Sequence, residues 1–380
     1  MALRDVVGQE TAVAVLQRAI RHGRITHAYL FAGPPNVGKT LTAVEFAQAI
    51  NCLEPPAEAD NCGRCAECAA IARGNHPDFR LVRPSVRAES QEEGTPARLG
   101  AELDGAEIRT EAIADLMTQA SLCRARGRRK VLVVSGADAM NDTAANRLLK
   151  TLEEPPVDTT LVLTAASPSL LLPTIVSRCQ LVRFGPVPSR QAEEALRAAF
   201  PDTAADEVRA VVALSGGRYG WARRMLASPQ VRQVRTGLLR LAAQLPSAPP
   251  VGCLKLAEVL VEAAEQWWTA TVEGEDAAKL LVQARDRVLR TTMSPVLDVL
   301  QTWYRDLALG PDTAPPDLLV NADHRDALHE AARLMSPNAA RQACAEIAAT
   351  RHALAGNANL TLALEVLLAR LMALSAPAPA

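Results

Sequence analysis

The chain has 380 residues, of which 41 are basic and 42 acidic, so its net charge is −1. This length predicts two or three domains with large buried cores, and the balanced charge excludes nucleic-acid binding by bulk positive charge. Aromatic residues make up 3% of the chain, which argues against a base-stacking platform, and no apolar run approaches the ~20 residues of a membrane span.

The first residues contain no secretory signal, because Arg4, Asp5, Gln9 and Glu10 interrupt any apolar stretch. We therefore expect a cytoplasmic protein that has no contact with a membrane. In such a protein clustered cysteines indicate a metal site rather than disulfides.

Short apolar runs alternate with helical patterns over residues 1–185, which is typical of a parallel sheet covered by helices. The fold class predicted for this part is therefore α/β. The expected strands are residues 27–32, 79–82, 131–135, 160–165 and 181–184. Residues 90–105 are rich in turn formers and poor in apolar side chains, so they are expected to form a surface loop.

Residues 33–40 read GPPNVGKT and fit the phosphate-binding pattern G-x-x-x-x-G-K-[ST]. The motif follows an expected strand and opens a helical pattern, which is the context that supports it. Its backbone N–H groups would surround phosphate oxygens, Lys39 would neutralise the outer phosphates, and the Thr40 hydroxyl would reach Mg²⁺. A vestigial loop kept only for its turn is the weaker interpretation, because every motif position is filled. We expect ATP or ADP to bind through Gly33, Asn36, Val37, Gly38, Lys39 and Thr40.

Four of the eight cysteines, namely Cys52, Cys62, Cys65 and Cys68, have the spacing C-x9-C-x2-C-x2-C. Thiolates on tight turns suit a tetrahedral zinc ion, and four of them leave no position for a reactive water. The sequence therefore predicts a structural Zn²⁺ site. His76 follows the cluster and is expected to be a loop or packing residue. The remaining cysteines are expected to be small buried thiols, namely Cys123, Cys179, Cys253 and Cys344.

The run RARGRRK at residues 124–130 is the one basic stretch with the composition of a DNA contact. It precedes an expected buried strand, so a solvated loop is the favoured interpretation. Beyond residue 186 the strand signal disappears. Residues 186–243 predict a small helical domain, residues 244–375 a second all-helical region, and residues 376–380 a disordered tail.

Several segments together resemble the clamp-loader branch of the AAA+ ATPases. They are VVGQE (6–10), RITHAYLFAGPPNVGKT (24–40), the cysteine cluster, NRLLKTLEEPP (146–156) and LLPTIVSRCQ (171–180). Near the C-terminus, NANLTLALEVLLARL (357–371) is similar to the last collar helix of that family. The resemblance is dense over residues 1–185 and thin beyond them.

This resemblance implies an AAA+ P-loop parallel-sheet core with an embedded zinc module, followed by an α-helical lid and an all-α collar that serves oligomerisation. It also implies a place in the DNA polymerase III machinery for DNA replication. The partners implied are the gamma/tau and delta subunits in a hetero-oligomeric ring, the sliding clamp, and primer-template DNA held by the assembled complex.

In this family the arginine of the motif Ser177-Arg178-Cys179 projects into the ATP site of the neighbouring subunit. A planar, permanently charged guanidinium can stabilise charge on the transferring phosphate, so Arg178 is the expected catalytic residue, acting in trans. An ordinary surface salt bridge is the alternative role for this side chain.

Hydrolysing relatives carry Asp-Glu at the end of the strand at 131–135, where this chain has Ser135-Gly136. Asp138 is displaced and is expected to cap the following helix. The second sensor arginine of the relatives aligns with Gly220 or Trp221. Losing a metal ligand and a water-positioning acid costs orders of magnitude in rate. The resemblance thus implies a subunit without independent ATPase activity.

Two other functions remain open at this point. An active gamma/tau-like ATPase shares the motifs but should carry the acidic strand end. A zinc-dependent nucleic-acid-binding module is disfavoured by the balanced charge and by the position of the cysteines inside an ATPase core.

Overall fold

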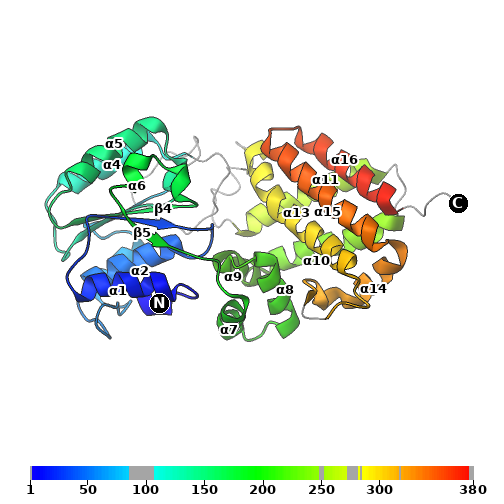
Figure 1. Ribbon diagram of the computed structural model, residues 1–380, viewed down its shortest axis with the longest axis horizontal. Coiled ribbons are helices and arrows are strands. Elements are labelled where there is room, and N and C mark those ends of the chain that lie inside the picture. Colours follow the sequence, from blue (N-terminus) through cyan, green and yellow to red (C-terminus); the bar gives the residue numbers. More distant parts are fainter. Residues whose placement is uncertain are drawn as a thin grey trace. The chain divides into compact units, whose positions relative to one another are not determined.

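The computed structural model describes residues 2–84, 107–247, 252–271, 281–282, 285–315 and 318–375 (Figure 1). The predicted loop at 90–105 and the predicted tail at 376–380 lie outside these ranges. The chain divides into two compact units, Met1–Ala192 with Gly217–Gly220, and Glu193–Gly216 with Trp221–Ala380. The predicted boundaries at 185, 243 and 375 remain predictions. Within the described residues, every helix is too short or too polar to cross a membrane.

The first unit contains a five-stranded parallel sheet with the order β2-β3-β4-β1-β5. All five predicted strands are present to within about one residue at their ends. The strands are β1 (Ala28–Ala32), β2 (Phe79–Val82), β3 (Lys130–Val134), β4 (Thr159–Ala165) and β5 (Gln180–Arg183). The register aligns Leu30 of β1 with Leu163 of β4 and with Leu181 of β5.

Side chains of the central strands alternate between two separate cores, one on each face of the sheet. In β1, Tyr29 and Phe31 join the core under α1 (Glu10–Arg21) and α2 (Lys39–Asn51). Ala28, Leu30 and Ala32 join the core under α4 (Thr110–Ser121), α5 (Asp142–Glu153) and α6 (Pro173–Val176). Figure 1 shows these two sets of helices on opposite faces. Because both faces are covered, the three central strands β3, β4 and β1 are buried along their whole length, as expected for a parallel sheet.

One helix of the first unit precedes the first strand, and the others lie between successive strands. They are α1 (Glu10–Arg21), α2 (Lys39–Asn51), α3 (Ala66–Arg73), α4 (Thr110–Ser121), α5 (Asp142–Glu153) and α6 (Pro173–Val176). Three short 3-10 helices accompany them, η1 (Leu3–Asp5), η2 (Ala137–Ala139) and η3 (Pro168–Leu170).

In its described residues the second unit is entirely helical, as predicted. Its long helices are α8 (Ala205–Ser215), α9 (Tyr219–Ala227), α10 (Pro229–Gln244), α11 (Cys253–Thr271), α13 (Arg285–Leu309), α14 (Arg325–Leu334), α15 (Pro337–Ala355) and α16 (Leu360–Ser375), preceded by α7 (Ser189–Ala199) at the junction of the units. Two 3-10 helices, η4 (Leu245–Ser247) and η7 (Ala322–His324), lie between them.

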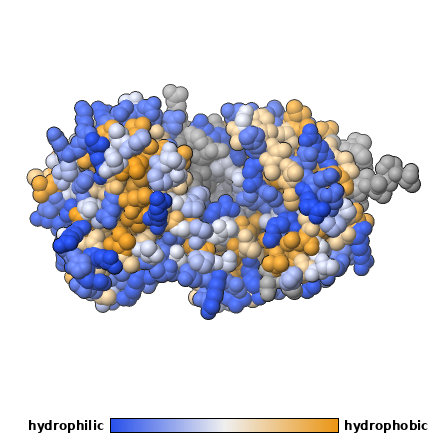
Figure 2. All heavy atoms as spheres, in the orientation of Figure 1, coloured by the Kyte–Doolittle hydropathy of each residue, from blue (hydrophilic) through white to orange (hydrophobic). Residues whose placement is uncertain are grey.

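Local sequence explains where several of these helices begin. Ser228 and Ser336 each precede a proline, and each side chain accepts a hydrogen bond from a backbone N–H in the first turn, of α10 and α15 respectively. This pairing of a capping serine with proline at the first helical position is a strong start signal. On the face shown in Figure 2, hydrophilic side chains are spread over both units with hydrophobic ones among them, in keeping with the balanced charge.

Candidate functional site

The loop 33–40 joins β1 to α2 at the carboxyl edge of the sheet, where ligands of open α/β sheets bind. The Gly33 N–H donates to the Ala165 carbonyl at 3.2 Å. A Cβ atom at Gly33 would come within 2.1 Å of the Phe184 carbonyl oxygen, so only glycine fits beside β5. Gly38 has a φ of +104° and precedes the first residue of α2, which directs the free N–H groups of the helix start toward the loop.

Lys39 is nearly buried, with 8% of its surface exposed. Its Nζ donates to the Gly33 and Pro34 carbonyl oxygens, each at 2.6 Å. The ammonium group therefore lies inside the curve of the loop, close to the position where the motif would hold phosphate oxygens.

Hydroxyl groups meet at the end of β3. Thr40 Oγ1 and Ser135 Oγ are hydrogen-bonded at 2.7 Å, and the Gly136 N–H donates to Thr164 Oγ1 at 2.9 Å. Thr164 was not singled out from the sequence. Its position as a polar residue near the carboxyl end of an apolar strand could have indicated a site residue. Among the described residues, this cluster brings Thr40 of the loop together with Ser135, one of the two residues expected to align with the acids of hydrolysing relatives.

The expectation for Asp138 was wrong. Asp138 lies in η2, and the helix α5 is capped instead by Asn141, whose side chain accepts from the Ala144 N–H at 2.8 Å. Because η2 intervenes, the N-cap of α5 lies three residues beyond the acid, at Asn141.

Two further segments of the first unit contact the loop, and sequence reasoning did not single out either contact. Gln9 Nε2 donates to the Val37 carbonyl at 3.3 Å and to the Gly185 carbonyl at 2.8 Å. The Gly220 N–H donates to the Asn36 carbonyl at 2.8 Å. Gly220 is one of the two residues, with Trp221, that are expected to align with the sensor arginine of relatives, and it contacts the loop through its backbone.

The four predicted ligand cysteines come together. Their sulfur atoms all lie within 4.8 Å of one another, and within the described residues they form the only candidate metal cluster of histidine, cysteine or acidic side chains. A tetrahedral zinc ion with bonds of about 2.3 Å would separate its sulfurs by about 3.8 Å, which is compatible with this upper limit. Cys52 is at the C-cap position directly after α2, Cys65 is at the N-cap position of α3, and Cys68 lies in the first turn of α3. These residues fit a metal ion of the kind that thiolates bind.

Hydrogen bonds already favour negative charge on part of this cluster. The Cys62 N–H donates to Cys52 Sγ and the Cys65 N–H donates to Cys62 Sγ. Burial raises the pKa of the Cys52 and Cys68 thiols. Burial also acts on Cys65, but hydrogen bonds from the backbone of Cys68 and Leu53 outweigh it and lower the pKa of that thiol to about 6. Such a thiolate is a ready metal ligand.

His76 is buried and lies outside the cysteine cluster, in keeping with a structural role. Its Nδ1 accepts from the Asp78 N–H at 2.9 Å and its Nε2 pairs with Glu67. The other cysteines differ from expectation. Cys123 is exposed because it lies in the loop after α4 rather than in a core. Cys179 and Cys344 are half-buried. The Cys253 side chain lies outside the described residues.

The basic run 124–130 is anchored by one carboxylate. Asp78 accepts hydrogen bonds from the N–H groups of Ala125, Arg126 and Gly127 at 2.7–2.9 Å. The side chains of Arg124, Arg126 and Arg128 are exposed, in agreement with a solvated loop. Lys130 is different, because it is buried and donates to the carbonyls of Gln119 and Leu122.

Arg178 follows the short helix α6 and is partly exposed. Its guanidinium donates to Glu153 Oε1 at 2.8 Å and to the Thr174 carbonyl at 2.9 Å. The side chain is 35% exposed and that of Glu153 is 52% exposed, so the pair is open to water. Exposed ion pairs of this kind contribute little to stability.

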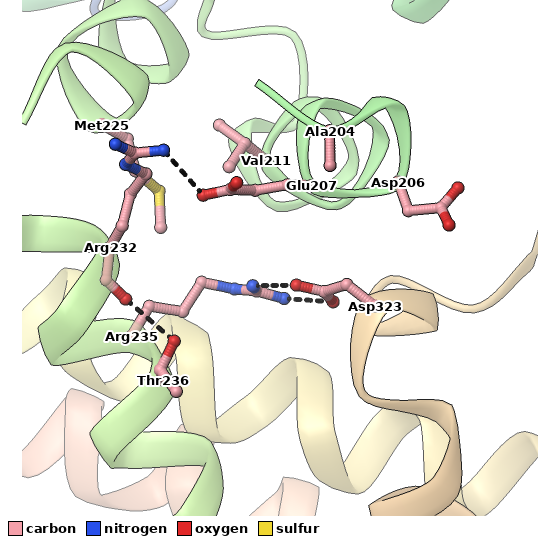
Figure 3. Close-up of a pocket in the computed structure, with 9 residues that line it drawn as sticks. All are labelled: Ala204, Asp206, Glu207, Val211, Met225, Arg232, Arg235, Thr236 and Asp323. Atoms are coloured by element: carbon pink, nitrogen blue, oxygen red, sulfur yellow. Dashed lines mark hydrogen bonds and ion pairs between the residues drawn. The ribbon is translucent and has the colours of Figure 1, made fainter. Parts of the chain in front are cut away.

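The second unit holds a polar pocket of about 390 Å³ that the sequence did not predict (Figure 3). Two ion pairs border it, Arg232 with Glu207 and Arg235 with Asp323. Arg235 is 4% exposed, and its guanidinium also donates to Asn321 Oδ1 at 2.9 Å. These contacts fasten α10 to α8 and to η7 within the unit.

A parallel sheet in this strand order, with a phosphate-binding loop after β1, fits the AAA+ class of α/β proteins. Residues 8–188 match the family described as DNA polymerase III, delta subunit. This match extends over just under half of the chain, and together with the similarity to delta-prime subunits given next it supports a delta-prime-type assignment.

Relatives of this chain include two DNA polymerase III subunits named delta-prime. The Pseudomonas aeruginosa subunit is 38% identical over 229 residues, which are 59% of this chain and 64% of the relative. The Bacillus subtilis subunit is 37% identical over 188 residues, which are 50% of this chain and 51% of the relative. The chain therefore spans about half to two thirds of the length of these relatives. The DNA polymerase III subunit tau of Bacillus subtilis is 33% identical over 187 residues, 49% of this chain and 29% of that subunit.

Proposed function

We propose that this chain is a delta-prime-type clamp-loader subunit that binds nucleotide with little or no hydrolysis. In this proposal it lends Arg178 to a neighbouring ATPase subunit while the assembled ring loads a sliding clamp onto primed DNA. Its partners would be gamma/tau and delta subunits. The core 1–185, the lid 186–243 and the collar 244–375 would have the roles that the family implies.

The hydroxyl pair of Thr40 and Ser135 is the observation that carries the proposal. The loop has every feature needed to bind phosphates, with Lys39 at its centre and the start of α2 behind it. The end of β3 nevertheless offers Ser135 Oγ and a glycine, and neither group can act as a general base toward water. A site that binds ATP or ADP, with Mg²⁺ near Thr40, and rarely turns it over is the function that this combination supports best.

The cysteine cluster supports a structural Zn²⁺ ion in this proposal. Four sulfurs complete a tetrahedral shell and leave no open position for chemistry. We expect about one zinc per chain, and Cys65→Ser with Cys68→Ser should lower zinc content and stability together. Elemental analysis that finds undiminished zinc in the double variant would refute the assignment.

The isolated chain tests the nucleotide site directly. Calorimetric titration with ATP and with ADP should give measurable binding, which Lys39→Ala should weaken, while phosphate release stays at background. Steady hydrolysis that is lost in Lys39→Ala would instead support the gamma/tau-like alternative. The zinc-dependent nucleic-acid-binding alternative gains no support from the basic run, because Asp78 and Glu67 engage its backbone and Arg126.

Arg178 is tested in a reconstituted loader that contains the partner ATPase subunits, clamp and primed DNA. Arg178→Ala should lower stimulated ATP hydrolysis, since fingers of this type contribute about 10³–10⁵ in rate at one site, an effect diluted in a ring with several sites. Arg178→Lys should rescue poorly, because lysine lacks the planar fork.

Glu153→Ala is the matched control for this experiment. It removes the Glu153–Arg178 ion pair and leaves the arginine in place. If Arg178 acts on the neighbour, only the arginine variants should lose activity. If Arg178 were merely a surface salt-bridge residue, the Glu153 and Arg178 variants would behave alike and both would assemble and hydrolyse ATP normally.

A further inference from the structure

We propose that Asp60 and Asn61, in the segment between Cys52 and Cys62, are positioning residues for the nucleotide loop, and that metal binding at the cysteines therefore controls nucleotide affinity. This inference rests on the proposed nucleotide site. It assigns a task to a metal module that takes no part in the chemistry.

The first link joins this segment to the N-terminus of the chain. The Leu3 N–H donates to Asp60 Oδ1 at 2.9 Å and to Asn61 Oδ1 at 2.7 Å. Asp60 and Asn61 are 1% and 0% exposed, and Leu3 is fully buried. Arg4 adds an ion pair to Asp60 Oδ2 at 3.4 Å. Buried amide and carboxylate groups that accept the same N–H hold that backbone in one place, because an unpaired group there would be costly.

The second link joins the same segment to the helix that starts at the phosphate loop. Asn61 Nδ2 donates to Glu45 Oε2 at 2.7 Å and to Gln48 Oε1 at 3.1 Å, and both acceptors lie on α2. Glu45 is 5% exposed, so without Asn61 its carboxyl group would lose its donor inside the protein. Asn61 thus ties Leu3 to the α2 helix.

The third link runs from Leu3 to the loop itself. Val6 lies against Gly38, because a Cβ atom placed on Gly38 would be 3.8 Å from Val6 Cγ1. Leu3, Val6 and Val37 share one buried core. Gln9 then hydrogen-bonds the Val37 carbonyl. Residues 3–9 therefore brace the outer side of the loop, and their position depends on Asp60 and Asn61.

Metal binding affects the position of Asn61 because Asn61 is directly followed by the ligand residue Cys62. The Cys62 N–H donates to Cys52 Sγ, so the backbone that places Asn61 is part of the cysteine cluster. A metal that binds Cys52 and Cys62 closes the segment 52–62 into a ring. Without the metal this ring is open, and the backbone that positions the side chains of Asp60 and Asn61 is no longer fixed.

The test measures ATP and ADP affinity, zinc content and hydrogen exchange of residues 3–9 in the full chain. Asp60→Ala and Asn61→Ala should keep one zinc per chain, weaken nucleotide binding about tenfold, and speed exchange at Leu3 and Val6. Asp60→Asn keeps an acceptor for Leu3 and should restore most of the affinity. Removing zinc from the wild-type chain with a chelator should weaken binding by a similar factor, and should add little in the two alanine variants.

Glu58→Ala is the matched control, because Glu58 lies in the same segment but is exposed and pairs only with Arg21 among the contacts described for it. It should leave affinity and exchange unchanged. If Asn61→Ala fails to fold, Asp60→Ala and Asp60→Asn decide the question. Folded, zinc-loaded Asp60→Ala with wild-type affinity would overturn the inference, as would a zinc-free chain that binds normally. A wild-type chain that binds neither ATP nor ADP would overturn the proposed function, and the inference with it.

Discussion

Ser135 and Gly136 differ in how easily they could be replaced by the acids of hydrolysing relatives. The Ser135 hydroxyl is hydrogen-bonded to Thr40 Oγ1 at 2.7 Å, so an aspartate at this position would bring a carboxylate toward the same hydroxyl. Gly136 has a φ of +69°, and a Cβ atom there would lie 3.1 Å from Pro84 Cγ. The backbone of this chain is therefore shaped around the absence of a side chain at the position where the water-positioning acid would be needed.

We predict that Ser135→Asp combined with Gly136→Glu does not create an ATPase. The left-handed backbone costs a residue with a Cβ about 1–2 kcal/mol, and the glutamate would be directed by the wrong backbone geometry. Urea unfolding should show this loss of stability relative to Ser135→Asp alone, while phosphate release stays at background. Rapid turnover by the double variant would show that the loop readily adopts the catalytic conformation.

The residues that sequence reasoning found are those with local motifs, and those that it missed act over long sequence distances. Lys39, Thr40 and the four cysteines are recognisable from spacing alone. Asn61, Gln9 and Thr164 meet their partners only after folding, with Gln9 hydrogen-bonding Gly185 across 176 residues. When a residue of a common type has its hydrogen-bond partner far away in the sequence, no local motif predicts the contact.

Among the elements, the segment 124–128 before β3 is held in its conformation by Asp78, the residue directly before β2. Burial by itself raises the pKa of this carboxyl group, but the N–H groups of Arg126, Gly127 and Ala125 outweigh it and hold the pKa below its usual value. Since the folded pKa is lowered, the stabilisation is present above the ordinary carboxyl range and is lost as the pH falls through the lowered pKa.

Asp78→Asn should therefore lower the free energy of unfolding at neutral pH by about 1–3 kcal/mol, because an amide cannot accept from all three N–H groups. The difference between the two proteins should begin to shrink below about pH 4, where the carboxyl group of the unfolded wild-type chain takes up a proton, and should be lost as the pH falls through the lowered pKa of the folded state. Urea unfolding over this pH range provides the measurement. Asp115→Asn, an exposed carboxylate on α4, is the control and should change stability by less than about 0.5 kcal/mol. An equal loss at every pH would contradict the charge-based explanation.

Helices and strands were predictable where the hydrophobic periodicity and the positions of helix-breaking residues agree. Pro295 is a residue at which these two signals conflict. The five strands follow from short apolar runs. Pro311 and Pro315 follow the end of α13, and Pro337 is the first residue of α15, so these prolines mark true helix boundaries. Pro295 nevertheless lies inside α13. Sequence rules place a break at such a residue because it lacks an N–H, but the buried side chains of Met293, Val296 and Leu297 hold α13 together on both sides.

For the whole molecule, two units with separate cores should respond separately to perturbation. The cysteine cluster lies in the first unit, whereas the core of the second unit is built from residues such as Trp268, Trp303 and Ile347. Metal binding stabilises only the unit whose folded state it recognises. The domain plan read from the sequence had no means to reveal this division, because α7 and residues 217–220 cross between the units.

We predict two transitions in a calorimetric scan, of which a zinc chelator lowers only one. Ile347→Ala, a fully buried change in α15, should lower only the other by removing about 2–5 kcal/mol from the second unit. Combining the chelator with the variant should give the sum of the two shifts. A single transition that both treatments lower would mean that the units unfold as one cooperative body.

The hydrogen bonds of Lys39 determine how the Lys39→Ala variant should be interpreted. Its ammonium group already has two partners, the carbonyl oxygens of Gly33 and Pro34. An arriving phosphate must compete with these oxygens, so binding is an exchange of acceptors rather than the filling of an unused charge. In Lys39→Ala the same two carbonyls lose their donor inside a tight loop, and the loop can relax even when no nucleotide is present. A loss of affinity in that variant therefore combines a missing phosphate contact with an altered resting loop, and the two contributions separate only when the stability of the nucleotide-free protein is measured beside its affinity.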